Sequence, residues 1–180
     1  MSKNKNKIGI FGGSFDPPHK GHLRISSTSI KKLNLKKVYW IVTKKNPFKK
    51  KTLFSLKERI LKCLKLTKKN KKIYVKSIDD KIKSCRTFKI IKHFRKKNKN
   101  DELYLIIGSD NLISFHKWDN WKIILKNCHL VVYPRKGFDK KARKSKIIRH
   151  IKNKNIIFIK GQKVDISSTK VRKQYQKNIR

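Results

Sequence analysis

Acidic residues are scarce in this chain of 180 residues, which has 10 Asp and Glu against 52 Lys and Arg and a formal net charge of +42. So few carboxylates form no dense cage for a metal ion, and we predict no metal site built from protein ligands. An excess of positive charge is typical of proteins that bind polyanions. The lysines are spread through nearly every segment, however, which favours a compositional bias over a specific nucleic-acid partner.

Cysteine patterns and long apolar runs are also missing. Cys63, Cys85 and Cys128 are odd in number, far apart and without C-x-x-C spacing, so the sequence indicates neither a disulfide framework nor a zinc site. The apolar run after the basic first residues is too short for a signal peptide, and no segment approaches membrane-spanning length. We therefore expect a cytoplasmic protein without a membrane partner. No internal repeat or linker divides the sequence, so residues 1–180 are expected to form a single domain.

Apolar runs alternate with helical patterns along the chain. This order predicts an α/β fold, a Rossmann-like parallel sheet with helices on both faces. Strands are expected near residues 7–11, 38–42, 72–76, 103–107, 129–133 and 155–159.

Helices are predicted between these strands from capping signals and apolar spacing. One is expected over residues 23–35, and another is expected to open at a capping box, Ser55 to Glu58. The apolar positions of this second helix repeat at helical spacing and are Leu56, Ile60, Leu61 and Leu64. Thr87 is expected to cap a further helix, and one more is predicted over residues 118–126.

Residues 12–22, which read GGSFDPPHKGH, lie where a short apolar strand turns into a helix. This is the place where α/β folds bind phosphates. Glycine allows a ligand to approach the backbone closely, and the two prolines stiffen the turn. His19 and His22 are one helical turn apart at the positive end of the helix dipole, so two imidazoles can face one anionic group.

A second motif lies near the other end of the chain, where residues 166–172 read ISSTKVR. Three hydroxyl side chains precede the predicted last helix, and Arg172 follows one turn later. Hydroxyls and free amides at a helix start can bind phosphate oxygens, and an arginine can neutralise their charge. A plain N-cap is the commoner role of such residues, but a cap does not need three hydroxyls.

Together these two motifs resemble those of the nucleotidyltransferases related to class I aminoacyl-tRNA synthetases. Residues 108–118, which read GSDNLISFHKW, are similar to the central motif of bacterial nicotinate-nucleotide adenylyltransferases. The resemblance covers nearly the whole chain, and three motifs in the right order make it specific. It implies the nucleotidyltransferase fold, and it implies adenylyl transfer from ATP to nicotinate mononucleotide, with ATP and that mononucleotide as partners and Mg²⁺ as cofactor.

The resemblance also implies roles for individual residues. His19, His22 and Arg172 are the expected catalytic residues. The expected ATP-binding and phosphate-binding residues are Gly12, Gly13, Ser14, Phe15, Gly21, Ser167, Ser168 and Thr169. Lys20 and Lys44 are further candidate cations. The expected mononucleotide-binding residues are Asn46, Thr87, Asp110 and Trp118, with Trp118 stacking on nicotinate and amides near Thr87 and Asp119 receiving its carboxylate. Where the family often has Tyr-Thr followed by Asp-Thr, this chain has Arg86, Thr87 and then Phe88, Lys89 and Ile90.

Two alternatives to this activity remain open from the sequence, as does the choice between nicotinate and nicotinamide mononucleotide as the acceptor. Phosphopantetheine adenylyltransferases share both phosphate motifs, but they usually have Thr in place of the first histidine and lack the central segment that ends in Trp118. A basic nucleic-acid-binding protein would account for the charge and would leave the spacing of glycine, proline and histidine unexplained. The oligomeric state is not indicated by the sequence.

Overall fold

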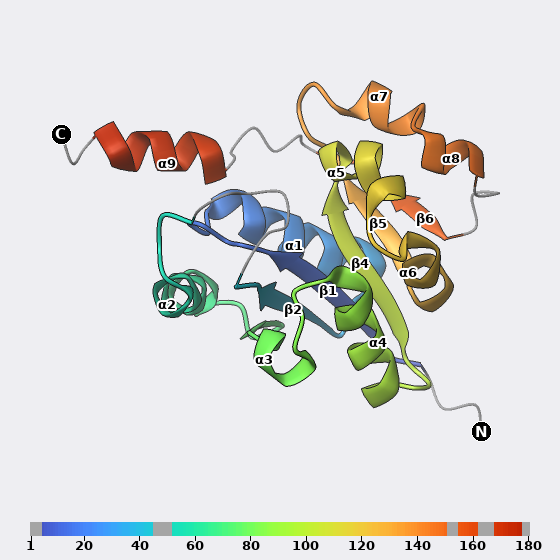
Figure 1. Cartoon of the computed structure of the whole chain (residues 1–180), viewed down its shortest axis with the longest axis horizontal. Helices are drawn as coiled ribbons and strands as arrows, with labels where there is room; N and C mark the ends of the chain where they lie inside the picture. The colour runs from blue at the N-terminus through green and yellow to red at the C-terminus, as the bar shows by residue number, and fades with distance from the viewer. Residues whose placement is uncertain (1–4, 45–51, 151–154, 162–167, 178–180) are drawn as a thin grey trace.

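A six-stranded parallel sheet forms the centre of the molecule (Figure 1). The computed structural model describes residues 5–44, 52–150, 155–161 and 168–177. The strand order is β3-β2-β1-β4-β5-β6. The strands are β1 (Lys7–Gly13), β2 (Lys37–Val42), β3 (Ile73–Lys76), β4 (Glu102–Gly108), β5 (His129–Tyr133) and β6 (Ile156–Phe158). The predicted fold class is confirmed, and each predicted strand agrees to within two residues at either end.

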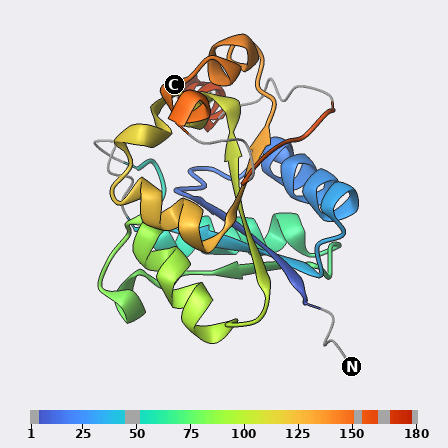
Figure 2. The ribbon, with the colours of Figure 1, turned by 90° about the vertical axis from the view of Figure 1, so that its right-hand side faces the viewer.

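Helices cover both faces of this sheet, as Figure 2 shows. α1 (Lys20–Leu33) and α2 (Leu56–Thr67) pack on one face around Trp40 and Cys63, and α4 (Thr87–Lys97), α5 (Ser109–Ser114) and α6 (Trp121–Asn127) pack on the other around Ile91 and Phe115. Residues 103–107 of β4 are all buried, because this strand lies inside the sheet and is covered on both faces. A strand in that position needs a continuous apolar sequence. The remaining elements are α3 (Asp79–Ile82), the 3₁₀ turn η1 (Phe115–Lys117), α7 (Asp139–Arg143), α8 (Lys146–His150) and α9 (Ser168–Lys177).

Three helix starts differ from the prediction. α1 begins at Lys20 rather than residue 23, because His19 takes the extended N-cap conformation inside the motif. Thr87 is the first helical residue of α4 and not its cap, a position held by the extended Arg86. The helix predicted from residue 118 begins three residues later, at Trp121, because the N-cap Asn120 adopts a left-handed conformation (φ 52°).

The buried face of α2 agrees with the prediction only in part. The capping box is confirmed: the Ser55 amide donates to Oε2 of Glu58 at 2.8 Å, and the Glu58 amide donates to Oγ of Ser55 at 3.2 Å. Leu61 and Leu64 are 56% and 47% exposed, however. The fully buried side chains of this helix are Arg59, Cys63 and Thr67. Leu56 and Ile60 are partly buried and pack against the core, so the apolar spacing predicted the helix and two of its inward positions but not the burial of Arg59.

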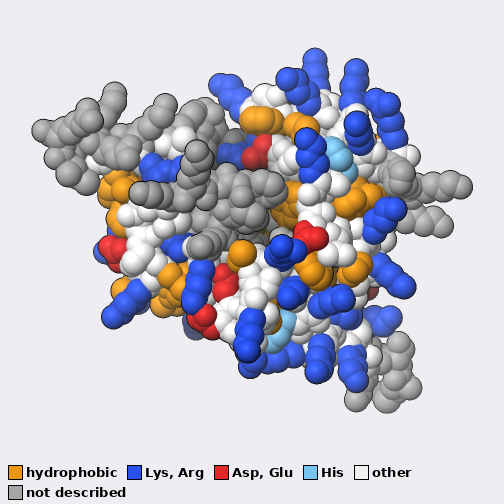
Figure 3. Space-filling model, in the orientation of Figure 1, with side chains coloured by type: hydrophobic (Ala, Val, Ile, Leu, Met, Phe, Trp, Pro, Cys, Tyr) orange, Lys and Arg blue, Asp and Glu red, His pale blue; other side chains and the backbone are white. Residues whose placement is uncertain are grey.

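Lys and Arg side chains are scattered over the whole visible face of the described residues, and acidic side chains appear only in small groups (Figure 3). The positive charges are distributed over many elements rather than gathered in one stripe, which agrees with the pattern in the sequence.

The three cysteines are free thiols, two of them buried. Among the helices in the described part of the chain, none is both long and apolar enough to cross a membrane.

Candidate active site

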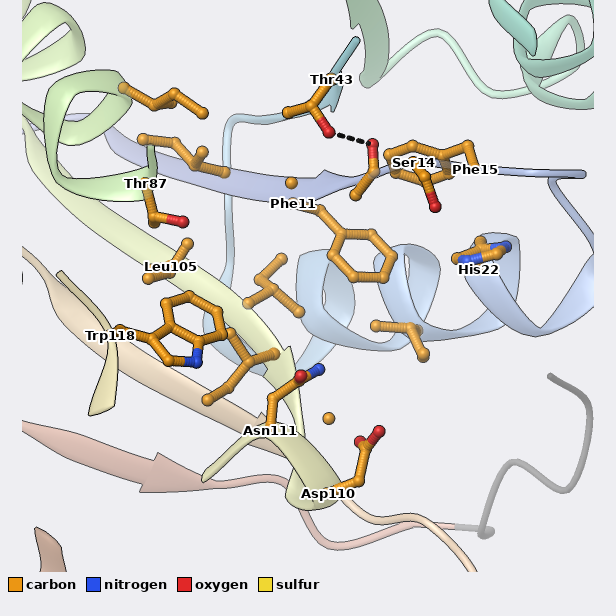
Figure 4. Close-up of a pocket in the computed structure, with 18 of the residues that line it drawn as sticks. Phe11, Ser14, Phe15, His22, Thr43, Thr87, Leu105, Asp110, Asn111 and Trp118 are labelled. Carbon is orange, nitrogen blue, oxygen red and sulfur yellow. Dashed lines mark hydrogen bonds between the residues drawn. The ribbon is translucent and has the colours of Figure 1, made fainter. Parts of the chain in front are cut away.

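A cavity of about 610 Å³ lies at the carboxyl ends of β1 and β4. The strand order reverses between these two strands, and α/β sheets bind ligands at such a switch point. The predicted site residues that line this cavity are Gly12, Gly13, Ser14, Phe15, His19, His22, Thr87, Asp110, Trp118, Ser168 and Thr169. Figure 4 shows the His22 ring and the Trp118 indole at opposite ends of the drawn pocket, with Phe11 between them.

The glycine-rich turn is held rigidly at the end of β1. Thr43, just after β2, donates through its amide (3.0 Å) and its hydroxyl (3.3 Å) to the Gly13 carbonyl, an interaction that Figure 4 marks. Phe15 has a left-handed backbone (φ 45°), and its buried ring stacks on Trp40 with a centroid distance of 4.9 Å. An aromatic anchor thus fixes the loop that follows the two glycines.

The two histidines of the motif lie side by side, with ring centroids 3.8 Å apart. The backbone amide of His19 donates to Nδ1 of His22 at 3.1 Å. A ring nitrogen that accepts an N–H carries no proton, so the proton of the His22 ring is on Nε2. His22 therefore caps the start of α1 through Nδ1, and the N–H donor of its ring is Nε2.

His19 is uncharged near neutral pH. Burial, and to a lesser degree the positive charge of Arg135, lowers its pKa from 6.5 to about 4. Its Nδ1 atom is buried and has no hydrogen-bond partner among the described residues. A neutral imidazole in the cavity wall can donate one hydrogen bond to an anion but adds no positive charge there.

Asp16 joins three parts of the chain beneath the cavity. Its fully buried carboxylate accepts hydrogen bonds from the amides of Leu53 (2.9 Å) and Phe54 (3.0 Å). The Arg172 guanidinium from α9 donates to the same carboxylate at 3.3 Å and to the Asp16 carbonyl at 3.1 Å. Ser168 at the start of α9 donates to the Pro17 carbonyl at 3.3 Å. The two motifs at opposite ends of the sequence are therefore in contact.

Some predicted residues lie elsewhere. Gly21 is buried in the first turn of α1, and neither it nor Arg172 lines the cavity. The Lys44 ammonium pairs with Asp80, while Lys20 is exposed. Asn46 and Ser167 lie outside the described residues.

Asp110 lines the cavity next to β4. The Arg135 guanidinium donates to its Oδ2 atom at 2.6 Å, so this carboxylate is paired. A Cβ atom at Gly108 would collide with the Asp110 carboxylate and come within 2.9 Å of Cδ of Arg135. Glycine at position 108 therefore makes room for the pair.

Two arginines that support the site, Arg59 and Arg135, were not predicted from the sequence. Arg135 follows β5 and has no motif of its own. Arg59 is only 1% exposed and donates to the carbonyls of Ser14 (2.6 Å), Thr43 (2.8 Å) and Phe54 (3.1 Å), so it ties together the loops behind the cavity. The four-residue spacing of Arg59 and Cys63 places both on one face of α2, but it does not indicate which carbonyls Arg59 binds.

The switch-point cavity, the glycine-rich turn and the paired histidines at a helix start define a nucleotide-binding α/β protein. Residues 10–174 match the model of the family described as Cytidylyltransferase-like. The chain is 44% identical over 173 residues to a probable nicotinate-nucleotide adenylyltransferase of Pelagibacter ubique, with 96% of each chain covered. It is 35% identical over 165 residues to the probable enzyme of that name from Aquifex aeolicus, covering 89% of this chain and 98% of that protein. The chain therefore belongs to the Cytidylyltransferase-like family and, within it, to the nicotinate-nucleotide adenylyltransferases.

Solved structures agree in fold. The nicotinic acid mononucleotide adenylyltransferase of Plasmodium falciparum, complexed with APC, superposes with a TM-score of 0.73 at 23% identity and covers 93% of this chain and 83% of that one. The same enzyme complexed with NaAD gives a TM-score of 0.72 with the same coverage. At this identity the likeness shows the nucleotidyltransferase architecture of the chain.

Proposed function

We propose that this chain transfers the adenylyl group of ATP to nicotinate mononucleotide, forming nicotinate adenine dinucleotide and pyrophosphate. The observation that carries the proposal is that one cavity holds both His19 and His22 of the phosphate motif and Thr87 and Trp118 of the acceptor segments. The names of the relatives and the ligands of the structural neighbours support the same reaction.

The reaction needs no proton acceptor from the protein. An oxygen of the mononucleotide phosphate, already ionised near neutral pH, forms a bond to the α-phosphorus of ATP. The bond from that phosphorus to the bridging oxygen breaks, and its electron pair leaves with pyrophosphate. Positioning and stabilisation of the charge on the α-phosphate oxygens are therefore the main work of the site.

His22 is the residue best placed to stabilise that charge. Its Nδ1 atom accepts the His19 amide, which fixes the ring and directs the protonated Nε2 as a donor. Preorganised donors cost no reorganisation when charge develops, and one such donor typically contributes a factor of about 10²–10³ in kcat. His19 lies against the His22 ring and would share the phosphate contact as a neutral donor.

The β- and γ-phosphates are assigned to the start of α9. Ser168 and Thr169 line the cavity there, and the helix dipole favours an anion at its first turn. Arg172 is one turn further along and donates to Oγ1 of Thr169 at 3.2 Å. Because its guanidinium also holds Asp16, we assign Arg172 the task of keeping α9 against the glycine-rich turn, where its charge also favours the departing pyrophosphate.

Mg²⁺ is expected to accompany ATP. Among the described residues no group of three or more His, Cys, Asp or Glu side chains is arranged to hold a metal ion, and Asp110 is paired with Arg135. The donor set fits an ion carried mainly by triphosphate oxygens and water. When bound, such an ion supplies charge neutralisation of the phosphates.

At the acceptor end, we assign the nicotinate ring to Trp118, which is half-buried and held by Phe115 at a centroid distance of 5.0 Å. We assign the ribose to Asp110 at the start of α5, whose carboxylate is held in place by Arg135. Asn111, which also lines the cavity, is a further donor within the same segment.

The test is pyrophosphate release from ATP with three acceptors compared in parallel: nicotinate mononucleotide, nicotinamide mononucleotide and phosphopantetheine. We expect the highest kcat/KM with nicotinate mononucleotide. Turnover of phosphopantetheine alone would assign the chain to the other adenylyltransferase class, and no turnover together with salt-dependent RNA binding would favour a nucleic-acid-binding protein.

A further inference from the structure

An ion pair closes one side of the acceptor end of the cavity. The Arg86 guanidinium, at the N-cap of α4, pairs with the carboxylate of Asp119, which follows Trp118. Both residues line the cavity. Their side chains are 62% and 43% exposed, so the pair lies at the mouth rather than in the interior.

The backbone of Arg86 is held by three hydrogen bonds, whereas its side chain is largely exposed. The Arg86 amide donates to Oγ of Ser84 at 3.2 Å, and the Arg86 carbonyl accepts from the amides of Lys89 (3.1 Å) and Ile90 (3.2 Å). An ion pair as exposed as Arg86 and Asp119 contributes only about 0–1 kcal/mol. Asp119 keeps a hydrogen bond from Nδ2 of Asn120 at 3.0 Å when the guanidinium leaves.

The surroundings of Arg86 favour an incoming carboxylate. α4 has no acidic residue in its first turn, so the positive end of its dipole has no competing anion from its own helix. A guanidinium binds a carboxylate through two parallel N–H donors, a geometry that a carboxamide cannot match because it presents one oxygen and one NH₂ group. A guanidinium in this position can therefore distinguish a carboxylate from a carboxamide on a pyridine ring.

We propose that Arg86 is a specificity-determining residue, which exchanges Asp119 for the ring carboxylate of nicotinate mononucleotide and so selects the acid over the amide. This inference rests on the proposed function, since it concerns the acceptor of that reaction. Asp119 holds the guanidinium at the cavity mouth until the substrate replaces it.

The decisive comparison is Arg86→Met against the parent, with kcat/KM measured for both mononucleotides. Loss of a charge-assisted contact should lower kcat/KM for the acid about ten- to a hundredfold, mainly through KM, and leave the amide within about twofold. Lys89→Met removes the same charge from an exposed position three residues along α4 and is the matched control, expected to change neither value. Equal losses for acid and amide in Arg86→Met would overturn the proposal.

Asp119→Asn gives an independent test with the opposite sign. Removing the competing carboxylate should lower KM for the acid about two- to fivefold, by no more than the ~1 kcal/mol that an exposed pair contributes. A raised KM for both mononucleotides would show that Asp119 itself binds substrate, and it would contradict the exchange.

Binding measured by quenching of tryptophan fluorescence separates failure of this inference from failure of the proposed function. If the parent forms no dinucleotide from either acceptor, the proposed function fails. The Arg86 inference then still stands if the parent binds nicotinate mononucleotide at least tenfold more tightly than the amide and Arg86→Met abolishes the difference. Equal affinities in the parent would overturn it.

Discussion

Arg172 and Asp16 are 156 residues apart in the sequence, and in the structure the Arg172 guanidinium donates to both the carboxylate and the carbonyl of Asp16. The contact joins the last described helix to the turn that follows β1. Because the Asp16 carboxylate also accepts the amides of Leu53 and Phe54, one buried side chain organises three segments around the cavity.

Asp16→Asn should therefore be costly. Removing one partner of a buried ion pair leaves the other charge uncompensated, and we expect a loss of about 3–5 kcal/mol in the free energy of unfolding, measured by urea titration. Asp80→Asn is the matched control, since Asp80 also pairs with a cation but is 80% exposed, and it should change stability by no more than ~1 kcal/mol. Similar losses in the two variants would refute the organising role of Asp16.

His22 is expected to combine a capping and a catalytic function. His22→Ala should lower kcat by about 10²–10³, with KM for ATP changed much less, because the lost donor acts mainly on the transition state. It should also destabilise the fold by about 0.5–2 kcal/mol, because the His19 amide loses its acceptor.

His22→Asn separates these two functions. The asparagine side chain offers an acceptor near the position of Nδ1 but no donor near that of Nε2. Stability should approach that of the parent, while kcat stays as low as in His22→Ala. A folded His22→Asn enzyme with kcat within a few-fold of the parent would exclude the transition-state role of His22.

The pH dependence of stability should report on His19. Its pKa of about 4 in the folded state lies below the 6.5 of the unfolded state, so the unfolded chain takes up the proton first as pH falls. The contribution of His19 is present above pH 6.5, decreases between pH 6.5 and about 4, and is lost below that. Between pH 7 and 5 the parent should lose more unfolding free energy than His19→Asn. A His19 NMR signal titrating near 6.5 in the folded protein would contradict this.

Trp118→Ala should raise KM for the mononucleotide about five- to a hundredfold, the range expected from loss of one aromatic stacking contact. KM for ATP should change little, because Trp118 lies at the end of the cavity opposite the phosphate motif. The kcat should also change little, because stacking stabilises the ground state and the transition state equally. Trp118→Phe keeps an aromatic face and should recover most of the affinity. Unchanged mononucleotide affinity in Trp118→Ala would remove this residue from the site.

The strands and the two phosphate motifs were predictable because their signals are local. Buried parallel strands need continuous apolar runs, and the turn after β1 needs its glycines, prolines and histidines close together. Neither motif alone predicts the contact of Ser168 with Pro17. Only the resemblance to a family indicated that the two motifs belong to one site.

The residues that support the site could not be predicted in the same way, because their partners lie far away in the sequence. Arg59 bonds to carbonyls of Ser14 and Thr43, and Arg135 bonds to Asp110, across separations that no periodicity encodes. Thr87 was assigned as a cap from its residue type, but the extended backbone of Arg86 fixes the helix start one residue earlier. At these positions tertiary contacts, rather than the local preference of each residue type, determine the structure.

The central claim is that the α-phosphorus of ATP is attacked by the mononucleotide, and tracing the phosphorus atoms tests it most directly. With ATP labelled at the α-phosphate, nicotinate mononucleotide and Mg²⁺, the label should appear in nicotinate adenine dinucleotide and not in pyrophosphate. With ATP labelled at the γ-phosphate, it should appear in pyrophosphate alone. Transfer of the γ-label to the mononucleotide, or release of the α-label only as AMP or ADP, would contradict adenylyl transfer.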